Sequence, residues 1–421
     1  RPVLLLMSPA TYRAGAFMAA ADALGIDAIS IVDTPDALRS PRTGRYAVSF
    51  GDLRQATDEI VAIAREVRAS AVLAVDDSAT ELAALVNAAL GLPHNRPESA
   101  TAARDKLVMR SLMHAGGART PAFRAVPAQL DPHSVADSLL YPSVVKPLRL
   151  SGSRGVIRVD DPPSFVAAFQ RVVAILESEG VEPATAMVLI EEYLPGDEVA
   201  LEGLLTAGEL TVLALFDKPD PLVGPFFEET IYITPSRLPD ATQAEIVEAT
   251  RVAALALGLR EGPIHAELRV NQQGAWLIEV AGRSIGGLCS TILTFGAGMS
   301  LEEMILRHAT GMEIGTTERS GGAVGVMMIP IPRSGIFRGV TGISEAAAVE
   351  GITGIEITAR VNYPIQALPE GASYLGFIFA RGDTPGSVEQ ALRDSHARLR
   401  IRIDALAPIA GARPVPLIAR R

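Results

Sequence analysis

Hydrophobic and polar residues alternate on two scales in the first quarter of the chain. Short apolar runs predict buried strands, and longer runs with helical periodicity predict helices. Strands are expected at 3–7, 27–32 and 70–75, and helices at 14–24, 58–68 and 80–90. This order predicts a small doubly wound α/β domain with a parallel sheet. No GxGxxG turn follows the first strand, so no dinucleotide site is expected there.

A second region, in which strands predominate, follows a helix at 100–115 that Gly116 and Gly117 end. Further strands are expected at 142–147, 156–159, 187–194, 199–206, 210–216 and 229–234, and helices at 163–179, 242–257 and 301–309. A hairpin pairs 264–270 with 275–280. From about residue 321, Gly and Pro separate short strands and one late helix at 387–397. The chain therefore combines α/β and α+β parts.

Composition narrows the class of protein. With 48% hydrophobic and 20% charged residues over 421 positions, the chain is typical of a globular protein with several domains. Its net charge of −10 argues against nucleic acid or an anionic membrane as the main partner. Apolar runs such as 252–259 are far shorter than the ~20 residues of a membrane-spanning helix, and the run 3–7 is too short for a signal peptide. The one cysteine, Cys289, cannot form an internal disulfide, which favours a reducing compartment, and we expect a soluble cytoplasmic protein.

The hairpin carries the first candidate chemistry. Pairing about a turn at 271–274, with its centre near position 273, sets Glu267 opposite Glu279 with Cβ atoms ~5 Å apart. Two carboxylates so placed repel one another unless a cation, a proton or an arginine lies between them, and Mg²⁺ prefers such oxygen ligands. His265 and Arg283 share the parity of this pair and should face the same way. The simpler interpretation is a solvated hairpin face with ordinary charges.

Two further segments are typical of nucleotide contacts but are ambiguous when taken singly. A strand ends in Lys146, and the loop Ser151-Gly152-Ser153-Arg154-Gly155-Val156 links it to the next strand. Backbone N–H groups of such a loop can cradle phosphates, although an ordinary hairpin turn has the same composition. The segment Glu191-Glu192-Tyr193-Leu194, followed by Glu198, can offer backbone groups to adenine and a carboxylate to ribose. An acidic strand end followed by an ordinary turn explains this segment equally well.

Lysine is rare in this chain. Only three of the 38 basic residues are lysines, at positions 106, 146 and 218. Where arginine is the usual cation, a lysine favours a place that requires a compact, mobile point charge, and compositional bias is the other explanation. Glu228 and Glu229 lie near Lys218 and could contact an amine, although a solvated strand start explains them more simply.

From about Arg104 to Arg283, the order and spacing of these features resemble the ATP-grasp superfamily. Within it, the chain is most similar to carboxylate–amine ligases of the L-amino-acid ligase kind. The resemblance implies an ATP-grasp fold with an N-terminal doubly wound α/β domain and a small C-terminal β-rich domain, and with ATP clamped between two sheets. The expected boundaries are 1–104 for the N-terminal domain, 105–185 for a lid with its linker helix, 186–315 for the C-terminal ATP-grasp subdomain and 316–421 for the last domain.

The resemblance also implies a role for each candidate residue. The lysines would bind phosphates, with Lys106 on the α-phosphate, Lys146 on the α- and β-phosphates and Lys218 on the γ-phosphate. The loop containing Ser151, Gly152, Ser153, Gly155 and Val156 would close over them. Glu191, Glu192 and Leu194 would hold adenine, largely through backbone groups, and Glu198 would hold ribose. Glu267 and Glu279 would bind Mg²⁺ (Mn²⁺ is an alternative), Arg283 would stabilise an acyl phosphate, and His265 would recognise a carboxylate or orient an amine, unless it is a satisfied core histidine.

The implied reaction joins a carboxylate to an amine. The carboxylate attacks the γ-phosphate of ATP to form an acyl phosphate and ADP, and the amine then displaces phosphate to give an amide or dipeptide. The expected substrates are small molecules, amino acids first, and a homodimer is compatible with the fold.

One departure from the superfamily separates the alternatives. Many members have Glu-x-Asn-x-Arg at the second metal ligand, whereas Ala281 stands in the place of that Asn here. The difference disfavours a glycinamide-ribonucleotide-synthetase-like, a biotin-carboxylase-like or a D-Ala–D-Ala ligase. Such an ATP-grasp ligase is nevertheless one alternative, and a non-catalytic ATP-binding protein is the other.

Overall fold

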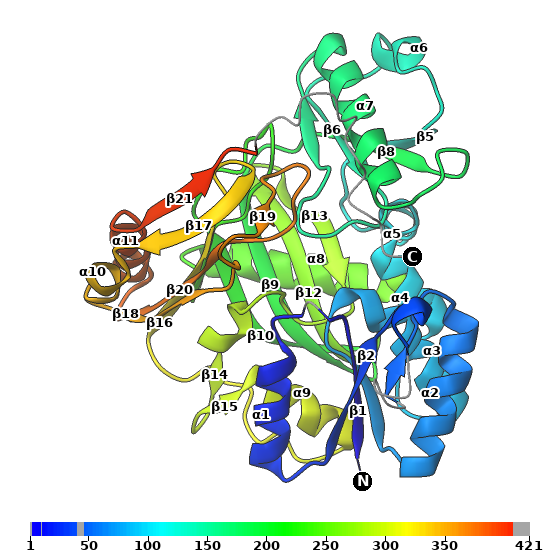
Figure 1. Ribbon diagram of the computed structural model, residues 1–421, viewed down its shortest axis with the longest axis vertical. Coiled ribbons are helices and arrows are strands. Elements are labelled where there is room, and N and C mark those ends of the chain that lie inside the picture. Colours follow the sequence, from blue (N-terminus) through cyan, green and yellow to red (C-terminus); the bar gives the residue numbers. More distant parts are fainter. Residues whose placement is uncertain (1, 10, 40–45, 407–421) are drawn as a thin grey trace.

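The computed structural model describes residues 2–9, 11–39 and 46–406 (Figure 1). These residues form an N-terminal α/β domain, a four-stranded lid and one long sheet that the C-terminal segments extend. No helix within the described ranges is long and apolar enough to cross a membrane.

The N-terminal domain is a parallel sheet covered on both faces. Its strands lie in the order β3-β2-β1-β4, and they are β1 (Val3–Met7), β2 (Ala28–Asp33), β3 (Ala47–Val48) and β4 (Ala71–Ala74). All of β1 is buried, because its alternate side chains enter two different cores. One face packs against α1 (Ala14–Leu24), and the other against α2 (Leu53–Val67) and α3 (Thr80–Leu90). The predicted doubly wound domain is confirmed.

The prediction of a single helix over 100–115 is wrong. The segment forms two helices, α4 (Pro97–Arg104) and α5 (Lys106–Ala115), with an extended residue, Asp105, between them. The Asp105 carboxylate accepts hydrogen bonds from the N–H groups of Leu107 and Val108 at 3.1 and 3.2 Å, and so caps the second helix. A capping aspartate competes with helix continuation, which the hydrophobic pattern does not reveal. The break makes Lys106 the first residue of α5.

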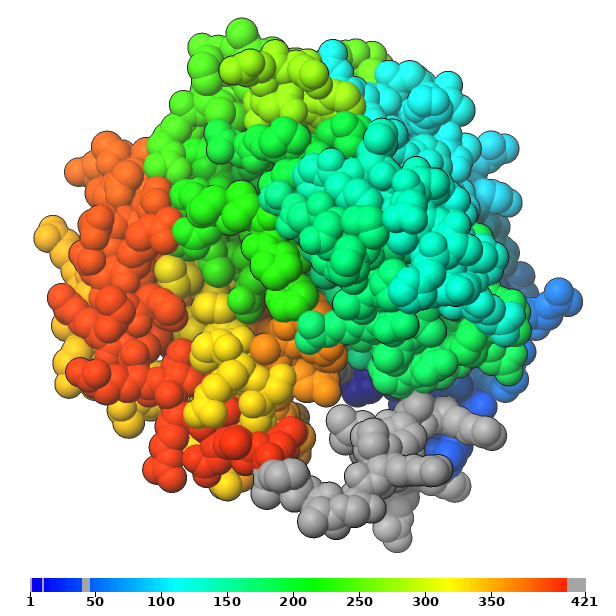
Figure 2. All heavy atoms as spheres, turned by 90° about the horizontal axis from the view of Figure 1, so that it is seen from above, coloured from blue at the N-terminus to red at the C-terminus, as the bar shows by residue number. Residues whose placement is uncertain are grey.

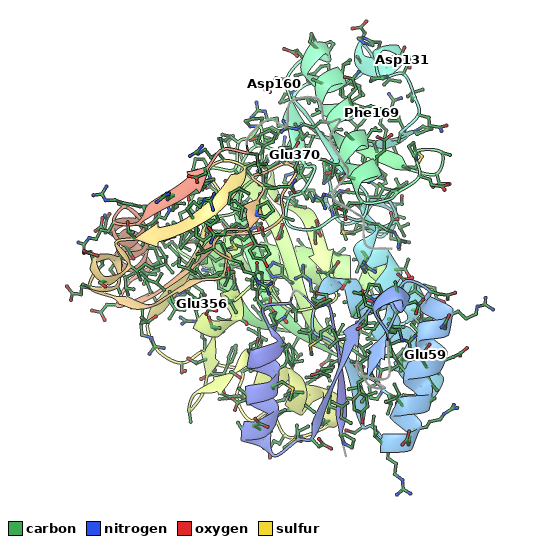
Figure 3. The ribbon with its side chains drawn as sticks, viewed as in Figure 1. Glu59, Asp131, Asp160, Phe169, Glu356 and Glu370 are labelled. Carbon is green, nitrogen blue, oxygen red and sulfur yellow. The ribbon has the colours of Figure 1, made fainter. Side chains whose placement is uncertain are left out.

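The lid, defined here as residues 123–192, is an antiparallel sheet with helices on one face. Its strands lie in the order β5-β8-β6-β7, and they are β5 (Phe123–Pro127), β6 (Ser143–Pro147), β7 (Ile157–Val159) and β8 (Met187–Glu192). Helices α6 (His133–Ala136) and α7 (Pro162–Ser178) cover this sheet. Phe169 of α7 is one of the buried residues in the core that the helices and the sheet share (Figure 3). Strand β8 pairs with β5 and β6, although the expected boundary assigns it to the next subdomain. We propose a boundary after Glu192 instead.

One eight-stranded sheet forms the rest of the core. Its order is β13-β12-β9-β10-β11-β16-β20-β18, and every neighbouring pair is antiparallel. The strands are β9 (Asp197–Thr206), β10 (Glu209–Lys218), β11 (Ile231–Thr234), β12 (Gly262–Asn271), β13 (Gly274–Ala281), β16 (Ala323–Ile329), β18 (Ile352–Ile357) and β20 (Gly376–Gly382).

The two faces of this long sheet meet different partners. One face packs against the N-terminal domain and α9 (Leu301–Thr310). A short hairpin of β14 (Thr294–Phe295) and β15 (Met299–Ser300) comes just before α9 in the chain. The other face packs against α8 (Asp240–Leu257) and α11 (Pro385–His396). Alternation along each strand thus sends neighbouring residues into different cores, as the pleat requires.

The C-terminal segments continue the long sheet. Strand β16 pairs with β11 along four residues, and β20 and β18 follow it, so no free sheet edge separates this part from the one before. A small β-rich part is present as expected, with β17 (Gly335–Thr341), α10 (Ile343–Ala347), β19 (Pro364–Ile365) and β21 (Arg400–Asp404). Seen from above, most of the yellow-to-red C-terminal segments lie to the left of the cyan-to-green lid, and an orange segment lies against it (Figure 2). Positions 407–421 of the expected last domain lie outside the described residues.

The packing of α11 on β16 gives a test of the fold. A Cβ atom at Gly325 would lie 2.6 Å from Val388 Cγ1 and 3.1 Å from Leu392 Cδ1. Gly325→Ala should therefore lower the free energy of unfolding by about 1–3 kcal/mol, measured by urea denaturation, because overpacking displaces buried side chains. Gly354→Ala in β18 is the matched control, since its Cβ would meet only Phe379 Cδ2 at 3.5 Å. Equal losses in the two variants would contradict this packing.

Candidate active site

One cavity lies between the lid and the long sheet, and it collects most of the predicted site residues. The glycine loop with β6 and β8 forms one wall, and the β12–β13 hairpin with the segment after it forms another. The predicted residues that line it are Lys106, Lys146, Ser151, Gly152, Ser153, Val156, Glu191, Glu192, Leu194, Glu198, His265, Glu267, Glu279 and Arg283. Two predicted residues, Gly155 and Lys218, lie outside this lining.

The β12–β13 hairpin places Glu267 opposite Glu279, as predicted. Next to the turn, Asn271 pairs with Gly274 and Leu268 with Leu277, and this register would set Glu267 against Ile278. A bulge between Glu267 and Leu268 inserts one residue into β13, and pairing resumes at Glu279. Because a slip of one residue exchanges the two faces of a strand, the bulge brings both carboxylates onto the same face.

Lys218, at the end of β10, holds three carboxylates together. Its Nζ lies 2.9 Å from Glu198 Oε1 and 3.6 Å from Glu267 Oε1, and it also donates a hydrogen bond to Glu229. The ammonium lies over the ring of Tyr232, 4.8 Å from its centroid. The lysine is buried behind these side chains, and in this structure it neutralises acidic groups rather than projecting into the cavity.

The charges in this cluster shift one another's pKa values. Burial favours the neutral form of Glu267, but Lys218 and His265 hold the pKa of Glu267 well below its usual range. Burial and the neighbouring Glu267 raise the pKa of Glu229 to about 7. Burial opposes the charge on Lys218, but the carboxylates around it raise the pKa of Lys218 well above its ordinary value. The interpretation of Glu229 as a solvated strand start is wrong, because its carboxylate bonds to Lys218 and only 18% of its side chain is exposed.

Lys146, in β6, is buried against β8. Its Nζ lies 2.5 Å from Glu191 Oε2, and Arg110 Nε donates to Glu191 Oε1 at 2.7 Å. Burial lowers the pKa of Lys146 to about 8, against the opposing effect of Glu191. Burial would raise the pKa of Glu191, but Arg110 and Lys146 hold it below its ordinary value. Arg110 was not among the predicted site residues. It also donates to the Ile278 carbonyl at the hairpin bulge and so joins α5 to both walls.

Lys106 connects the glycine loop to the hairpin. Its Nζ donates to the Leu150 carbonyl at 2.9 Å and lies 3.3 Å from Glu279 Oε2. This position depends on the break at Asp105, which sets Lys106 at the start of α5. All three lysines thus pair with carboxylates of the cavity wall, each from a different element.

The glycine loop between β6 and β7 is shaped by left-handed backbone. Gly152, Ser153 and Gly155 have φ values of 65°, 55° and 71°, a region that glycine adopts readily. Gly155 turns away from the cavity, where an added Cβ would lie 3.0 Å from Pro147 Cδ. Ser151, Gly152, Ser153 and Val156 line the cavity, as predicted for a loop that covers phosphates.

Residues 369–372 of the C-terminal part lie against the glycine loop and help to cover the cavity. The Gly155 N–H donates to the Pro369 carbonyl at 2.9 Å, and Ala372 lines the cavity. Arg171 of α7 makes two hydrogen bonds, of 2.5 and 3.0 Å, to Glu370, which lies where the C-terminal part meets the lid (Figure 3). No local sequence pattern marks this segment, because its role depends on a contact across about 200 residues of chain.

Arg269 organises the apolar end of the cavity next to the lid. It donates to the Leu194 carbonyl at 2.7 Å and to Glu198 Oε2 at 3.1 Å. Its guanidinium lies 5.2 Å from the ring centroid of Tyr193 and 5.5 Å from that of Phe227. Arg269 was not among the predicted site residues, although it shares the strand parity of His265 and Glu267, and this parity is a signal that the sequence contains.

Lys218 and its partners Glu198, Glu229 and Glu267 form a cluster that we call the ionic centre, and His265 and Arg283 line the same cavity. His265 Nδ1 is 3.0 Å from the buried Glu202 Oε2, and its Nε2 is 3.6 Å from Glu267 Oε1. Burial would lower the pKa of His265, but these two carboxylates raise it. Arg283 Nε lies 3.4 Å from Oδ1 of Asp77, which follows β4, so the N-terminal domain contributes to the site.

Two groups of carboxylates could hold a cation. Oxygen atoms of Glu198, Glu229 and Glu267 lie within 4.8 Å of one another, but the Lys218 ammonium already neutralises this group. Glu267 and Glu279 offer oxygen ligands from opposed strands, and the Glu279 side chain keeps 31% of its surface exposed. Such a pair fits a magnesium ion that also binds phosphate oxygens.

Comparison with known proteins identifies two domains in this chain. Residues 139–292 match the model of the ATP-grasp domain, and residues 327–404 match L-amino acid ligase C-terminal domain 2. The chain is 32% identical to alanine–anticapsin ligase of Bacillus subtilis over 213 residues, which is 47% of this chain and 44% of that protein. The chain thus spans about half the length of this curated relative.

Solved structures extend the likeness to nearly the whole chain. L-amino acid ligase from Bacillus licheniformis superposes with a TM-score of 0.80 at 25% identity and covers 96% of this chain and 99% of its own. Phosphoribosylglycinamide synthetase from Anaerococcus prevotii superposes with a TM-score of 0.65 at 16% identity, covering 96% and 100%, which shows a shared fold only. The predicted ATP-grasp fold and the resemblance to L-amino-acid ligases are confirmed.

The ionic centre predicts a stability change that can be measured without any ligand. Lys218→Met should lower the free energy of unfolding by about 3–5 kcal/mol in urea, because buried carboxylates lose their counterion. Adding Glu267→Gln removes a carboxylate whose pKa is held well below its usual range, so Lys218→Met/Glu267→Gln should recover part of the loss. Measurements in EDTA prevent a stray metal from replacing the ammonium. A double variant no more stable than Lys218→Met would contradict the electrostatic account.

Proposed function

We propose that this chain, which carries an ATP-grasp domain, is an ATP-dependent ligase that joins a carboxylate to an amine. Amino acids are the proposed substrates, and an amide or dipeptide is the product. The observation that carries the proposal is the single cavity in which Lys106, Lys146, Glu267, Glu279 and Arg283 converge between two sheets.

The proposed nucleotide position follows the polarity of the cavity. Adenine would lie in the apolar end, against Val144, Val156 and Phe227, with backbone groups of 192–194 on its edge. Glu198 would take a ribose hydroxyl, and the phosphates would run beneath the glycine loop toward Lys146 and Lys106. Both lysines are within reach of this path, since they line the same cavity.

The proposed metal ligands are Glu267 and Glu279. A Mg²⁺ ion, or Mn²⁺ in its place, would supply charge neutralisation at the phosphate oxygens when bound. Ala281 is buried at the end of β13, and its methyl side chain cannot bind a metal. The side-chain ligands from this hairpin would therefore be the two glutamates.

The proposed reaction has two steps that the residues of the chain assist by position and charge. A substrate carboxylate oxygen attacks the γ-phosphorus, the bond to the β–γ bridging oxygen breaks, and ADP leaves. The amine then attacks the acyl carbon, loses a proton and expels phosphate. Arg283 would bind the acyl phosphate, and His265 would orient the carboxylate or the amine. A protein thiolate has no part, because burial raises the pKa of Cys289 to about 12.

Two alternatives predict different results in one assay. An ATP-grasp ligase of the purine or biotin-carboxylase type would release ADP with phosphoribosylamine or bicarbonate but not with amino acids. A non-catalytic protein would bind ATP and release no ADP with any of them. A pairwise matrix of amino acids, assayed for phosphate release with those two compounds alongside, separates the three cases.

The metal assignment predicts the effect of one conservative substitution. Glu279→Gln should lower ADP formation by more than about 100-fold and leave the circular dichroism spectrum unchanged, because an amide oxygen replaces a carboxylate at the proposed ion. The matched control is Glu192→Gln, an exposed carboxylate on the same cavity that would act through its backbone. Turnover of Glu279→Gln at the rate of the control would overturn the assignment.

The low pKa of Lys146 predicts how nucleotide affinity depends on pH. Its folded-state pKa of about 8 lies below the ordinary 10.5, so the free protein loses this charge as the pH rises through 8. Because phosphates bind the protonated form, the dissociation constant of Mg²⁺-ADP should rise between pH 7.5 and 9, by up to about tenfold. Calorimetric titrations at several pH values measure the change.

Lys146→Arg is the control for this pH effect. A guanidinium keeps its charge throughout this range, so the affinity of the variant should vary little with pH. An equal slope in the two proteins would show that Lys146 is not the group that titrates.

A further inference from the structure

The cavity has two apolar ends, and strand β12 runs from one toward the other. Arg269 lies against Phe227 at the first end, Glu267 follows, and His265 bonds to Glu202, which accepts the Ile285 N–H at the second. The end next to the lid contains Val144, Val156 and Phe227, and it is the proposed place of adenine. The other end is formed mainly by the core of the long sheet and the N-terminal domain. Its lining residues are Tyr12, Ile285, Cys289, Met328, Tyr374 and Phe377.

We propose that this second end, which we call the distal pocket, binds the side chain of one of the two amino acids and selects a bulky apolar one. The proposal rests on the proposed ligase function, and it names the substrate class within it. If one apolar end takes the base and the centre takes phosphates, the remaining end lies on the γ-phosphate side, where the two substrates must meet.

The wall of the distal pocket is apolar and uncharged. Ile285, Cys289, Met328 and Phe377 are each at most 5% exposed and belong to one continuous core. The Tyr12 and Phe377 rings meet edge to face at 5.8 Å, and Tyr374 lies 6.4 Å from Phe377. Burial raises the pKa of both Cys289 and Tyr374, so neither carries charge at neutral pH. A charged side chain would lose its hydration here without gaining a partner.

Glycine gives the distal pocket its depth. Gly287 has φ +60°, and a Cβ there would lie 3.0 Å from Phe377 Cε1. At Gly286 the nearest atom to an added Cβ is Arg283 Nη1 at 4.0 Å, so the space beside Arg283 is open. Larger residues at these two positions would fill the room that a substrate side chain needs.

An acidic and a basic side chain line the cavity beside the distal pocket. Glu229 and Arg283 both line the cavity beside the apolar residues. A free amino acid carries an ammonium and a carboxylate on one carbon, so it can face both charges while its side chain enters the apolar end. The arrangement therefore suits a zwitterionic amino acid with an apolar side chain better than a dicarboxylic or dibasic one.

Two methionines on one strand allow a matched test. Met328 lines the distal pocket, whereas its neighbour Met327 points into the core beneath α11, and both are 5% exposed. Met328→Ala should widen the pocket and raise the ratio of kcat/KM for L-phenylalanine to that for L-leucine by about tenfold. Met327→Ala removes the same atoms from the same strand and should leave this ratio within about twofold of the parent value.

The assay measures phosphate release with L-alanine as the fixed partner and a series of second amino acids, with products identified by mass spectrometry. For the unmodified protein, L-leucine, L-methionine or L-phenylalanine should exceed glycine, L-aspartate and L-lysine in kcat/KM by about tenfold or more. A preference for glycine, L-aspartate or L-lysine would overturn the proposal. An equal shift of the ratio in the two methionine variants would also overturn it.

Failure of the ligase function can be told apart from failure of the pocket. If no pair of amino acids releases phosphate, thermal denaturation of the full chain with Mg²⁺-ADP still reports binding. Stabilisation by L-leucine or L-phenylalanine but not by L-aspartate, lost in Met328→Trp and kept in Met327→Ala, would support the pocket without the reaction. If none of these amino acids stabilises the protein in the presence of Mg²⁺-ADP, both the pocket and the amino-acid ligase function would be overturned.

Discussion

Acidic side chains that face one another within a largely buried cavity need cations, and the rest of the site depends on this requirement. Glu267 and Glu279 oppose each other across the hairpin, while Glu198 and Glu229 approach Glu267 from neighbouring elements. In a medium of low dielectric these charges would raise the free energy of the folded state by several kcal/mol if they were unpaired. Each wall of the cavity supplies a cation that removes part of this cost, so electrostatic compensation and the closed arrangement of the domains require one another.

The cations come from elements far apart in the chain, which is why the fold and the site cannot be separated. Lys106 starts α5, Lys146 belongs to the lid and Lys218 ends β10 of the long sheet. Arg110 bonds to Glu191 in the lid and to the backbone of the hairpin, so one side chain holds the two walls at a fixed distance. The C-terminal segment 369–372 adds a backbone hydrogen bond and an ion pair to the same lid.

Local pattern was sufficient to predict the parts of the site that lie along single elements. The hairpin turn and parity placed Glu267 opposite Glu279, although the structure reaches this pairing through a bulge that the sequence pattern does not disclose. The scarcity of lysine pointed to Lys106, Lys146 and Lys218, which all pair with carboxylates of the cavity. Partners that come from distant segments, among them Arg110 and Asp77, have no local signature, because their environment exists only after the chain has folded.

The pairing also explains why Lys106 and Lys146 are lysines in a chain so rich in arginine. Glu191 bonds to both Lys146 and Arg110, so Lys146 can turn toward a phosphate while the arginine keeps the carboxylate neutralised. Glu267 likewise has Lys218 and His265, and it stays compensated if Lys106 leaves Glu279 for a nucleotide and a metal takes its place. A flexible ammonium can exchange partners in this way, whereas an arginine held by two hydrogen bonds on a rigid plane is the better permanent brace. Under the proposed function, Lys106 and Lys146 would exchange partners while the arginines stay in place, so a polyanion would enter the buried acidic site without leaving any charge unpaired.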